Sequence, residues 1–180
     1  MLRLKKELRS RLKGARKIAV MGIGSPLRGD DAAGPLFIKE LEDAIKEAKK
    51  TLPAKSRTVP RSGTGARIKL ISCETVPENY TGDIRKFNPT HVIIVDAVDM
   101  GKEPGWADIV DLEERSEQVS FSTHRLPINM FIEYLKQYLN CQVITIGIQP
   151  KSIDFSSPLS DKVREAVKQV SDSVLRGLSI

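Results

Sequence analysis

The sequence predicts a three-layer α/β fold with a mostly parallel five-stranded sheet. Three observations predict it: short apolar runs, amphipathic stretches of helical periodicity between them, and the largely regular alternation of the two. Continuous apolar runs are typical of strands that helices cover on both faces, as in parallel sheets. A chain of 180 residues can bury a sizeable core, so we expect one domain over residues 1–180.

The strands are expected wherever a short apolar run is bounded by turn residues. Five segments qualify, at residues 17–23, 67–73, 91–95, 105–112 and 142–148. The 105–112 segment is more polar than the other four, so we place it at an edge of the sheet.

The helices are expected between these strands, with a further one at each end of the chain. The segments with helical spacing of apolar residues are 2–16, 35–50, 79–87, 126–139 and 160–178. Ser160 is a candidate N-cap of the last helix, and Pro127 falls in a first turn, where proline is tolerated. Residues 51–66 are basic and rich in proline and glycine, and we expect them to form a surface loop within the domain.

The net charge of +6 arises from basic residues concentrated in 1–17 and 49–69. A solvated basic surface, an acidic protein partner and a nucleic acid are three possible explanations. The basic stretches lack the aromatic side chains that stack on single-stranded bases, so we expect no nucleic-acid partner. We regard residues 1–16 as a basic N-terminal helix that extends the domain.

The location follows from two missing signals. No apolar run approaches the roughly 20 residues of a membrane helix. The N-terminus is basic but lacks the apolar core and cleavage site of a secretory signal. We therefore expect a cytoplasmic protein without a membrane partner, and we expect a monomer. Cys73 and Cys141 are expected to be buried, and a disulfide between them is possible if their strands are neighbours.

The most informative motif follows the first expected strand. Residues 18–34 join that strand to a glycine-punctuated turn, with Asp30 and Asp31 where the next helix should begin. A dinucleotide-binding motif would need its third glycine at position 27, which is Leu27, and Pro26 lacks a backbone N–H for a phosphate. One of the two acids could cap the helix, which would leave the other to face a cleft.

Two further polar residues stand at the ends of core segments. Asp96 follows the 91–95 strand, and His124 lies in the loop that enters the next helix. In α/β folds, sites lie at the carboxyl ends of strands, where the strand order reverses. Two carboxylates and one imidazole there would form an incomplete ligand set for a transition metal, which could polarise a carbonyl and activate a water. Taken singly, each residue could equally be an ordinary strand-end or loop residue.

Other chemistry is less well supported. His91 starts a strand and lies away from the predicted cleft. The chain has no G-x-S-x-G sequence, and Ser120 and Ser122 near His124 have no evident base and orienting partner. One histidine is too few for a zinc protease that holds its own metal.

Four motifs resemble those of the maturation endopeptidases of [NiFe]-hydrogenases, and most closely the archaeal members of the hydrogenase-3 type. They lie at residues 22–34, 94–98, 122–127 and 146–150, and the resemblance runs from about Lys17 to the C-terminus. It implies a hydrolase that removes a C-terminal extension from the hydrogenase large-subunit precursor after nickel has been inserted. The precursor is then the partner and supplies the nickel, and the free protein holds no metal tightly.

The resemblance also implies roles for individual residues. Asp31, Asp96 and His124 correspond to the catalytic residues that contact the nickel. Asp30 corresponds to a neighbouring acid that is not a ligand. The remaining implied residues bind substrate, and they are Glu74, Thr75 and Thr123. Cys73 and Glu74 stand where many members have two glycines, so the substrate contact in this segment is expected to differ.

Two rival functions remain open at this point. The protein could be a non-proteolytic module that binds and checks nickel-loaded hydrogenase precursor. It could also bind nucleic acid through its basic N-terminal helix and loop, which predicts steep salt dependence and indifference to Asp31.

Overall fold

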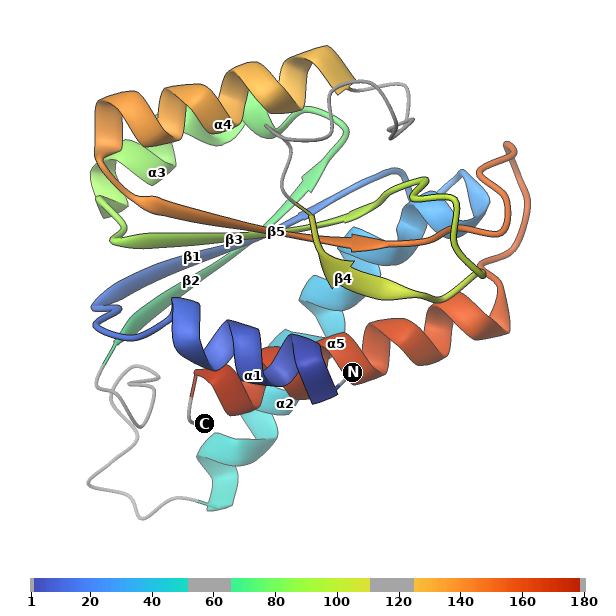
Figure 1. Cartoon of the computed structure of the whole chain (residues 1–180), viewed down its shortest axis with the longest axis horizontal. Helices are drawn as coiled ribbons and strands as arrows, with labels where there is room; N and C mark the ends of the chain where they lie inside the picture. The colour runs from blue at the N-terminus through green and yellow to red at the C-terminus, as the bar shows by residue number, and fades with distance from the viewer. Residues whose placement is uncertain (1, 52–65, 111–124, 179–180) are drawn as a thin grey trace.

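The structure is a computed structural model that describes residues 2–51, 66–110 and 125–178. Five strands form one sheet in the order β2-β1-β3-β5-β4 (Figure 1). Their bounds are β1 Lys17–Ile23, β2 Arg67–Glu74, β3 His91–Ala97, β4 Ala107–Ile109 and β5 Gln142–Ile148. All neighbouring strands are parallel except β4, which runs antiparallel to β5 at the edge. The predicted α/β fold with a mostly parallel five-stranded sheet is confirmed.

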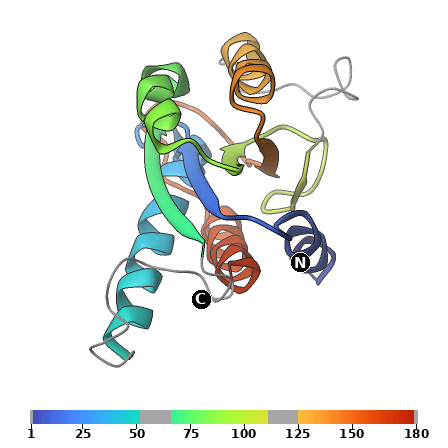
Figure 2. The same ribbon diagram turned by 90° about the vertical axis from the view of Figure 1, so that its left-hand side faces the viewer.

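Helices cover both faces of this sheet, which gives the three expected layers (Figures 1 and 2). Helices α3 and α4 lie on one face, and α1, α2 and α5 lie on the other. The bounds of the α-helices are α1 Leu2–Arg11, α2 Ala33–Thr51, α3 Thr81–Phe87, α4 Arg125–Leu139 and α5 Asp161–Gly177. Two 3-10 turns, η1 Gly29–Ala32 and η3 Pro77–Tyr80, precede α2 and α3.

The apolar strands supply two cores, one on each face. Along β1, Ile18 and Val20 belong to the core shared with α1, α2 and α5, whereas Ala19 and Met21 belong to the core shared with α3 and α4. Successive side chains of a strand point to opposite faces, so a strand buried on both sides has to be apolar at every position. Six of the seven residues of β1 are buried accordingly.

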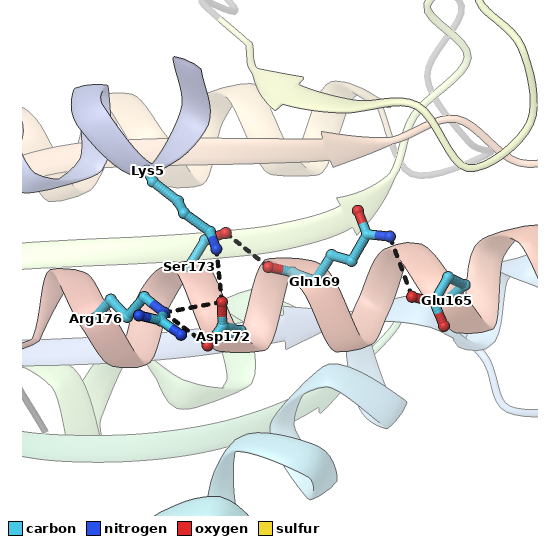
Figure 3. Close-up of polar contacts among 6 residues, drawn as sticks. All are labelled: Lys5, Glu165, Gln169, Asp172, Ser173 and Arg176. Carbon is cyan, nitrogen blue, oxygen red and sulfur yellow. Dashed lines mark hydrogen bonds and ion pairs between the residues drawn. The ribbon is translucent and has the colours of Figure 1, made fainter. Parts of the chain in front are cut away.

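Helix α1 is part of the larger core. Leu4 and Leu8, one helical turn apart, are buried and pack toward α5. At the edge of this contact, Lys5 Nζ lies 2.7 Å from Asp172 Oδ2, and Arg176 Nε lies 2.9 Å from Asp172 Oδ1 (Figure 3). The helix ends at Arg11, earlier than the sequence predicts, because the chain turns at Gly14, whose φ is +77°.

The two cysteines are free and buried. Cys73 lies in β2, and Cys141 immediately precedes β5, from which β2 is separated by two strands. At roughly 4.8 Å per strand the two lie too far apart for the ~7 Å limit between the Cα atoms of a disulfide. The strands are not neighbours, so the possible disulfide is excluded. Burial raises the pKa of the Cys73 thiol to about 12.

The basic loop predicted at 51–66 falls almost entirely outside the described residues. None of the helices in the described part of the chain combines the length and apolar character that crossing a membrane requires.

Candidate functional site

The strand order reverses between β1 and β3. The chain passes from β1 outward to β2, and then returns to place β3 on the other side of β1. The loops that leave the carboxyl ends of β1 and β3 therefore diverge to opposite sides, and we call this switch point, where α/β folds place their sites, the crevice. Asp31 lies in η1 directly after β1, and Asp96 lies in β3.

Glycine at position 24 allows η1 to lie close to the end of β1. Gly24 has φ +130°, and a Cβ at this position would lie 1.8 Å from the backbone oxygen of Asp31. Its N–H donates to the carbonyl of Glu74 at 2.7 Å, which joins the ends of β1 and β2. The glycine-punctuated turn therefore serves close backbone packing, and this packing places Asp31 at the crevice.

The Asp31 carboxylate is only half satisfied. Its Oδ2 accepts a hydrogen bond from Ser25 N–H at 2.8 Å. Its Oδ1 is buried and has no hydrogen-bond partner among the described residues, and the residue as a whole is 2% exposed. A buried carboxylate oxygen without a partner is costly, so this atom is a candidate to bind a cation or a proton.

The Asp96 carboxylate is in a similar position. Asp96 pairs with Gly147 across the β3–β5 ladder, it is 4% exposed, and its Oδ1 also has no partner within residues 2–51, 66–110 and 125–178. Burial raises the pKa of Asp96 well above its ordinary value, and the nearby charge of Asp31 raises it further, against a smaller opposing effect from the Ala97 backbone. Strand β3 continues one residue beyond Asp96, so this acid lies within the strand and not in the loop that follows it.

Asp30, by contrast, is fully bonded. Its carboxylate accepts hydrogen bonds from the backbone N–H groups of Lys151 and Ser160, each at 2.7 Å, and from the Ser160 hydroxyl at 3.0 Å. Among the described residues, neither Asp30 nor Asp31 hydrogen-bonds the first turn of α2 through its side chain, so the helix-capping interpretation of these acids is wrong. Ser160 is the N-cap residue of α5 as predicted, but its hydroxyl donates to Asp30 and does not cap the helix.

The predicted substrate-binding residues lie at the end of β2, where Glu74 is the last residue of the strand and Thr75 follows it. Glu74 is exposed and Thr75 is half-buried. Glu74 has φ +48°, a conformation that favours glycine. The position where the resembled family often has glycine is thus one where this chain holds a larger residue in the left-handed region.

His124 and Thr123 lie outside the described residues, as do Ser120 and Ser122. Helix α4 begins at Arg125, on the side of the sheet where β1 and β3 end (Figure 1). Within residues 2–51, 66–110 and 125–178, no three acidic, histidine or cysteine side chains are grouped so as to hold a metal ion.

The other histidine lies at the opposite end of the strands from Asp31 and Asp96. His91 begins β3, and its Nδ1 lies 3.0 Å from the Thr90 hydroxyl oxygen. Burial lowers the pKa of His91, and hydrogen bonds to the Arg11 backbone and to Gln142 partly offset this effect. It is thus separated from Asp31 and Asp96 by the length of the strand, in agreement with the sequence interpretation.

One buried polar residue at the carboxyl end of β5 was not singled out from the sequence. Gln149, just after β5, is 6% exposed. Its Oε1 accepts from the N–H groups of Met100 and Lys102, at 2.7 and 3.1 Å, and its Nε2 donates to Asp99 Oδ1 at 3.0 Å. It therefore ties the loop that follows β3 to the end of β5. The motif at residues 146–150 contained this glutamine, but no chemical pattern assigned it a partner.

The arrangement suits a positive charge. Two buried carboxylates repel one another, and each has an oxygen that no group in the described part of the chain bonds. Carboxylate oxygens accept many divalent metals, and an added imidazole suits nickel, zinc, copper and iron. The described donors, Asp31 and Asp96, fit such an ion as an incomplete set that needs further ligands.

Comparison with known proteins gives a consistent result. The family model of hydrogenase maturation protease (HycI) matches residues 54–177. A hydrogenase maturation protease of Methanocaldococcus jannaschii is 37% identical over 161 residues, 89% of this chain and 88% of the relative. The hydrogenase 3 maturation protease of Escherichia coli K12 is 33% identical over 148 residues, 82% of each chain.

A solved structure extends the comparison to the fold. The [NiFe] hydrogenase maturation protease HycI from Thermococcus kodakarensis KOD1 superposes with a TM-score of 0.78 at 28% identity, over 97% of this chain and 99% of that chain. The family model spans most of this sequence, and two relatives above 30% identity match it over more than four-fifths of their length. The chain therefore belongs to the hydrogenase maturation protease family.

Proposed function

We propose that this protein removes the C-terminal extension of a [NiFe]-hydrogenase large-subunit precursor after nickel insertion, and that it recognises the nickel which the precursor carries. The single observation that supports the site is a pair of buried carboxylate oxygens at the switch point, Asp31 Oδ1 and Asp96 Oδ1, which have no partner among the residues that the structure describes. Membership of the family supports the hydrolytic activity.

The charge of the site favours a ligand that brings its own metal. Asp31 and Asp96 raise the energy of one another's ionised form, and a divalent cation between them would offset that repulsion. His124 would supply a third contact. Three ligands leave coordination positions for groups that the precursor already holds on its nickel. A nickel-free precursor would lack this contact, and the pair would stay uncompensated.

The chain's own residues then have separate roles in peptide hydrolysis. Asp31 is held through its second oxygen by Ser25 N–H, which leaves Oδ1 for the metal. Asp96 holds a proton more strongly than an ordinary aspartate, and a cation at the crevice would favour its release. The substrate's nickel supplies Lewis acidity, which polarises a carbonyl or a water near the scissile bond.

The substrate extension would run along the end of β2. Glu74 and Thr75 stand there, and the carbonyl of Glu74 bonds to Gly24 within the turn that carries Asp31. Thr123 would contact the extension from the segment beside His124. The exposed Glu74 side chain would give this member a charged contact where glycine would give none.

Intact-mass spectrometry of a large-subunit precursor, prepared with and without nickel and mixed with this protein, tests the proposal. We expect a C-terminal fragment to be lost from the nickel-loaded precursor alone, and no loss with His124→Ala. Cleavage of both forms would show that nickel is not the recognition element. Binding of the loaded precursor without any cleavage would favour the non-proteolytic checking module.

A further inference from the structure

We infer that Asp30 is a positioning residue, whose carboxylate fixes η1 to the loop between β5 and α5 and thereby fixes the direction of the neighbouring Asp31 side chain. The catalytic part of this inference rests on the proposed function. The structural part concerns only the orientation of Asp31 and can be measured without a substrate.

The first step of the argument is the burial of Asp30. Its exposed fraction is 1%, and a carboxylate is rarely buried so deeply unless it is well bonded. Its Oδ1 accepts from Ser160 N–H at 2.7 Å. Its Oδ2 accepts from Lys151 N–H at 2.7 Å, from Ser152 N–H at 3.3 Å and from the Ser160 hydroxyl at 3.0 Å.

The second step is that all these donors belong to one segment, residues 151–160, far along the chain from Asp30. The backbone of Asp30 joins the same segment, because its N–H donates to the carbonyl of Ser152 at 2.9 Å. Gly29 packs against that carbonyl as well, since a Cβ there would lie 2.7 Å from it. The turn η1 is therefore held to this loop by side chain, by backbone and by close contact.

The third step concerns the helix that follows the loop. Ser160 is the N-cap of α5, so the Asp30 carboxylate lies at the positive end of a 17-residue helix. Asp30 bonds the N-cap residue itself, through both the N–H and the hydroxyl of Ser160. Helix α5 packs against α2 and the sheet, which makes it a rigid support for η1.

The last step links this support to the site. Asp30 and Asp31 are adjacent in a four-residue 3-10 turn, so a rotation of one peptide reorients the other. The backbone N–H of Asp31 donates to the carbonyl of Arg28 at 3.0 Å, but among the described residues its side chain has one hydrogen bond, from Ser25 N–H. The bonds of Asp30 therefore add to the packing at Gly24, and by fixing the turn they constrain the direction in which Asp31 Oδ1 points.

The test uses Asp30→Asn in the full chain, with the Ser25 amide as the reporter because its N–H donates to Asp31 Oδ2. Hydrogen exchange at Ser25 is measured by NMR, and Asp31→Ala gives the rate without the acceptor. We expect about tenfold faster exchange at Ser25 in Asp30→Asn, since a hydrogen bond to a charged group is lost or weakened. Exchange at Ile94 in the core reports global opening, and the change at Ser25 has to exceed it.

A matched control is available on the same helix. Asp161→Asn makes the same chemical change at an exposed first residue of α5, and we expect Ser25 exchange to stay within about twofold. Ser160→Ala removes only the hydroxyl donor, and we expect about threefold faster exchange at Ser25. This milder variant keeps the inference testable if Asp30→Asn does not fold.

The processing assay completes the test. We expect kcat of Asp30→Asn to fall about 100-fold with a nearly unchanged KM, because misplacement of a reacting group by about 1 Å has this effect. If a folded Asp30→Asn or Ser160→Ala protein keeps the wild-type Ser25 exchange rate, the inference is wrong. If the wild-type protein cleaves no precursor while Ser25 responds as expected, the proposed function fails and the positioning role of Asp30 stands.

Discussion

Negatively charged side chains have opposite environments in two regions of the molecule. One region is the contact between α1 and α5, and the other is the crevice between β1 and β3. In the contact between α1 and α5, the side chain of Asp172 is 44% exposed and forms ion pairs with the side chains of Lys5 and Arg176 (Figure 3). Its hydrogen bond with Lys5, followed by that with Arg176, lowers the pKa of Asp172. In the second, Asp96 is buried beside another acid, and its pKa is raised.

The difference distinguishes charged side chains that stabilise the fold from charged side chains that destabilise it. Exposed pairs such as Lys5–Asp172 join two helices and contribute little free energy, because water and salt screen them. Two buried carboxylates with unpartnered oxygens reduce stability, and such groups are concentrated at functional sites. Four predictions test this contrast, ordered by the size of the expected effect.

The largest effect is expected on activity. Asp31→Asn and Asp96→Asn each remove one charge from the pair, and we expect processing of the nickel-loaded precursor to fall by about 1,000-fold, as for the loss of an electrostatic contact to a reacting group. Asp172→Asn should change the rate by less than about twofold. Rates are read from the loss of precursor mass. Near-normal processing by Asp96→Asn would show that the buried acid pair is not needed for activity.

The next prediction concerns the close backbone packing between Gly24 and Asp31, which places Asp31 near Asp96. Gly24→Ala places a Cβ 1.8 Å from the Asp31 carbonyl oxygen at a φ of +130°, so we expect a loss of about 2–3 kcal/mol in the free energy of unfolding. Gly82→Ala is the control, because nothing lies within 4 Å of its Cβ in α3. That variant should gain about 0.5 kcal/mol. Urea denaturation measures both, and equal values would contradict the packing argument.

A smaller effect concerns the pH dependence that Asp96 contributes. Because its pKa is raised in the folded state, the folded protein retains this proton where the unfolded chain has lost it. The stability contribution is therefore fully present below the unfolded pKa, near 3.8, and is lost as the pH rises through the folded pKa. We expect Asp96→Asn to be about 1–2 kcal/mol more stable than wild type at pH 8.

Thermal unfolding of wild type and Asp96→Asn between pH 3.5 and 8 measures this difference. The advantage of the variant should shrink toward zero at the acidic end, where the wild-type carboxyl is protonated in both states. An advantage that stays constant with pH would show that the effect does not come from ionisation of Asp96.

The smallest effect is on the stability contribution of Asp172, whose pH dependence is opposite to that of Asp96. The lowered pKa of Asp172 gives a stability contribution that is present above the unfolded pKa and is lost as the pH falls through the folded pKa. With a 44% exposed side chain, solvent screening limits the loss in Asp172→Asn to about 0.5 kcal/mol at pH 7. The difference should diminish in about 1 M salt. A loss that persists in high salt would indicate packing rather than charge.

The central strands could be predicted from sequence because their apolar pattern is continuous. The expected segments 17–23 and 142–148 coincide with β1 and β5. The edge strand was predicted as 105–112, whereas the strand found is Ala107–Ile109. Its later start follows from Gly105, which has φ +84° and lies against the backbone of Lys162 in α5, and the predicted residues 111–112 lie outside the described residues. A local pattern does not contain such a contact with a distant helix.

The site was predictable to the extent that it depends on strand ends. Asp31 and Asp96 could be placed together because each was expected at the carboxyl end of a parallel strand, and the structure brings their charges close enough to interact, although Asp96 lies within β3 and not after it. The role of Asp30 could not be predicted, since its partners lie 121 to 130 residues later in the chain. The contacts of Gln149 were missed for the same reason, because Met100 is 49 residues away.

The packing of α1 against α5 also determines when folding can be completed during synthesis. Lys5 and Asp172 are 167 residues apart, and a ribosome adding about 5–20 residues per second needs about 10–30 s to make the chain between them. Throughout that interval the buried leucine face of α1 has no α5 to cover it. The nascent chain therefore presents an apolar helix near its beginning until its last helix emerges, and this favours binding of a chaperone to the N-terminal region.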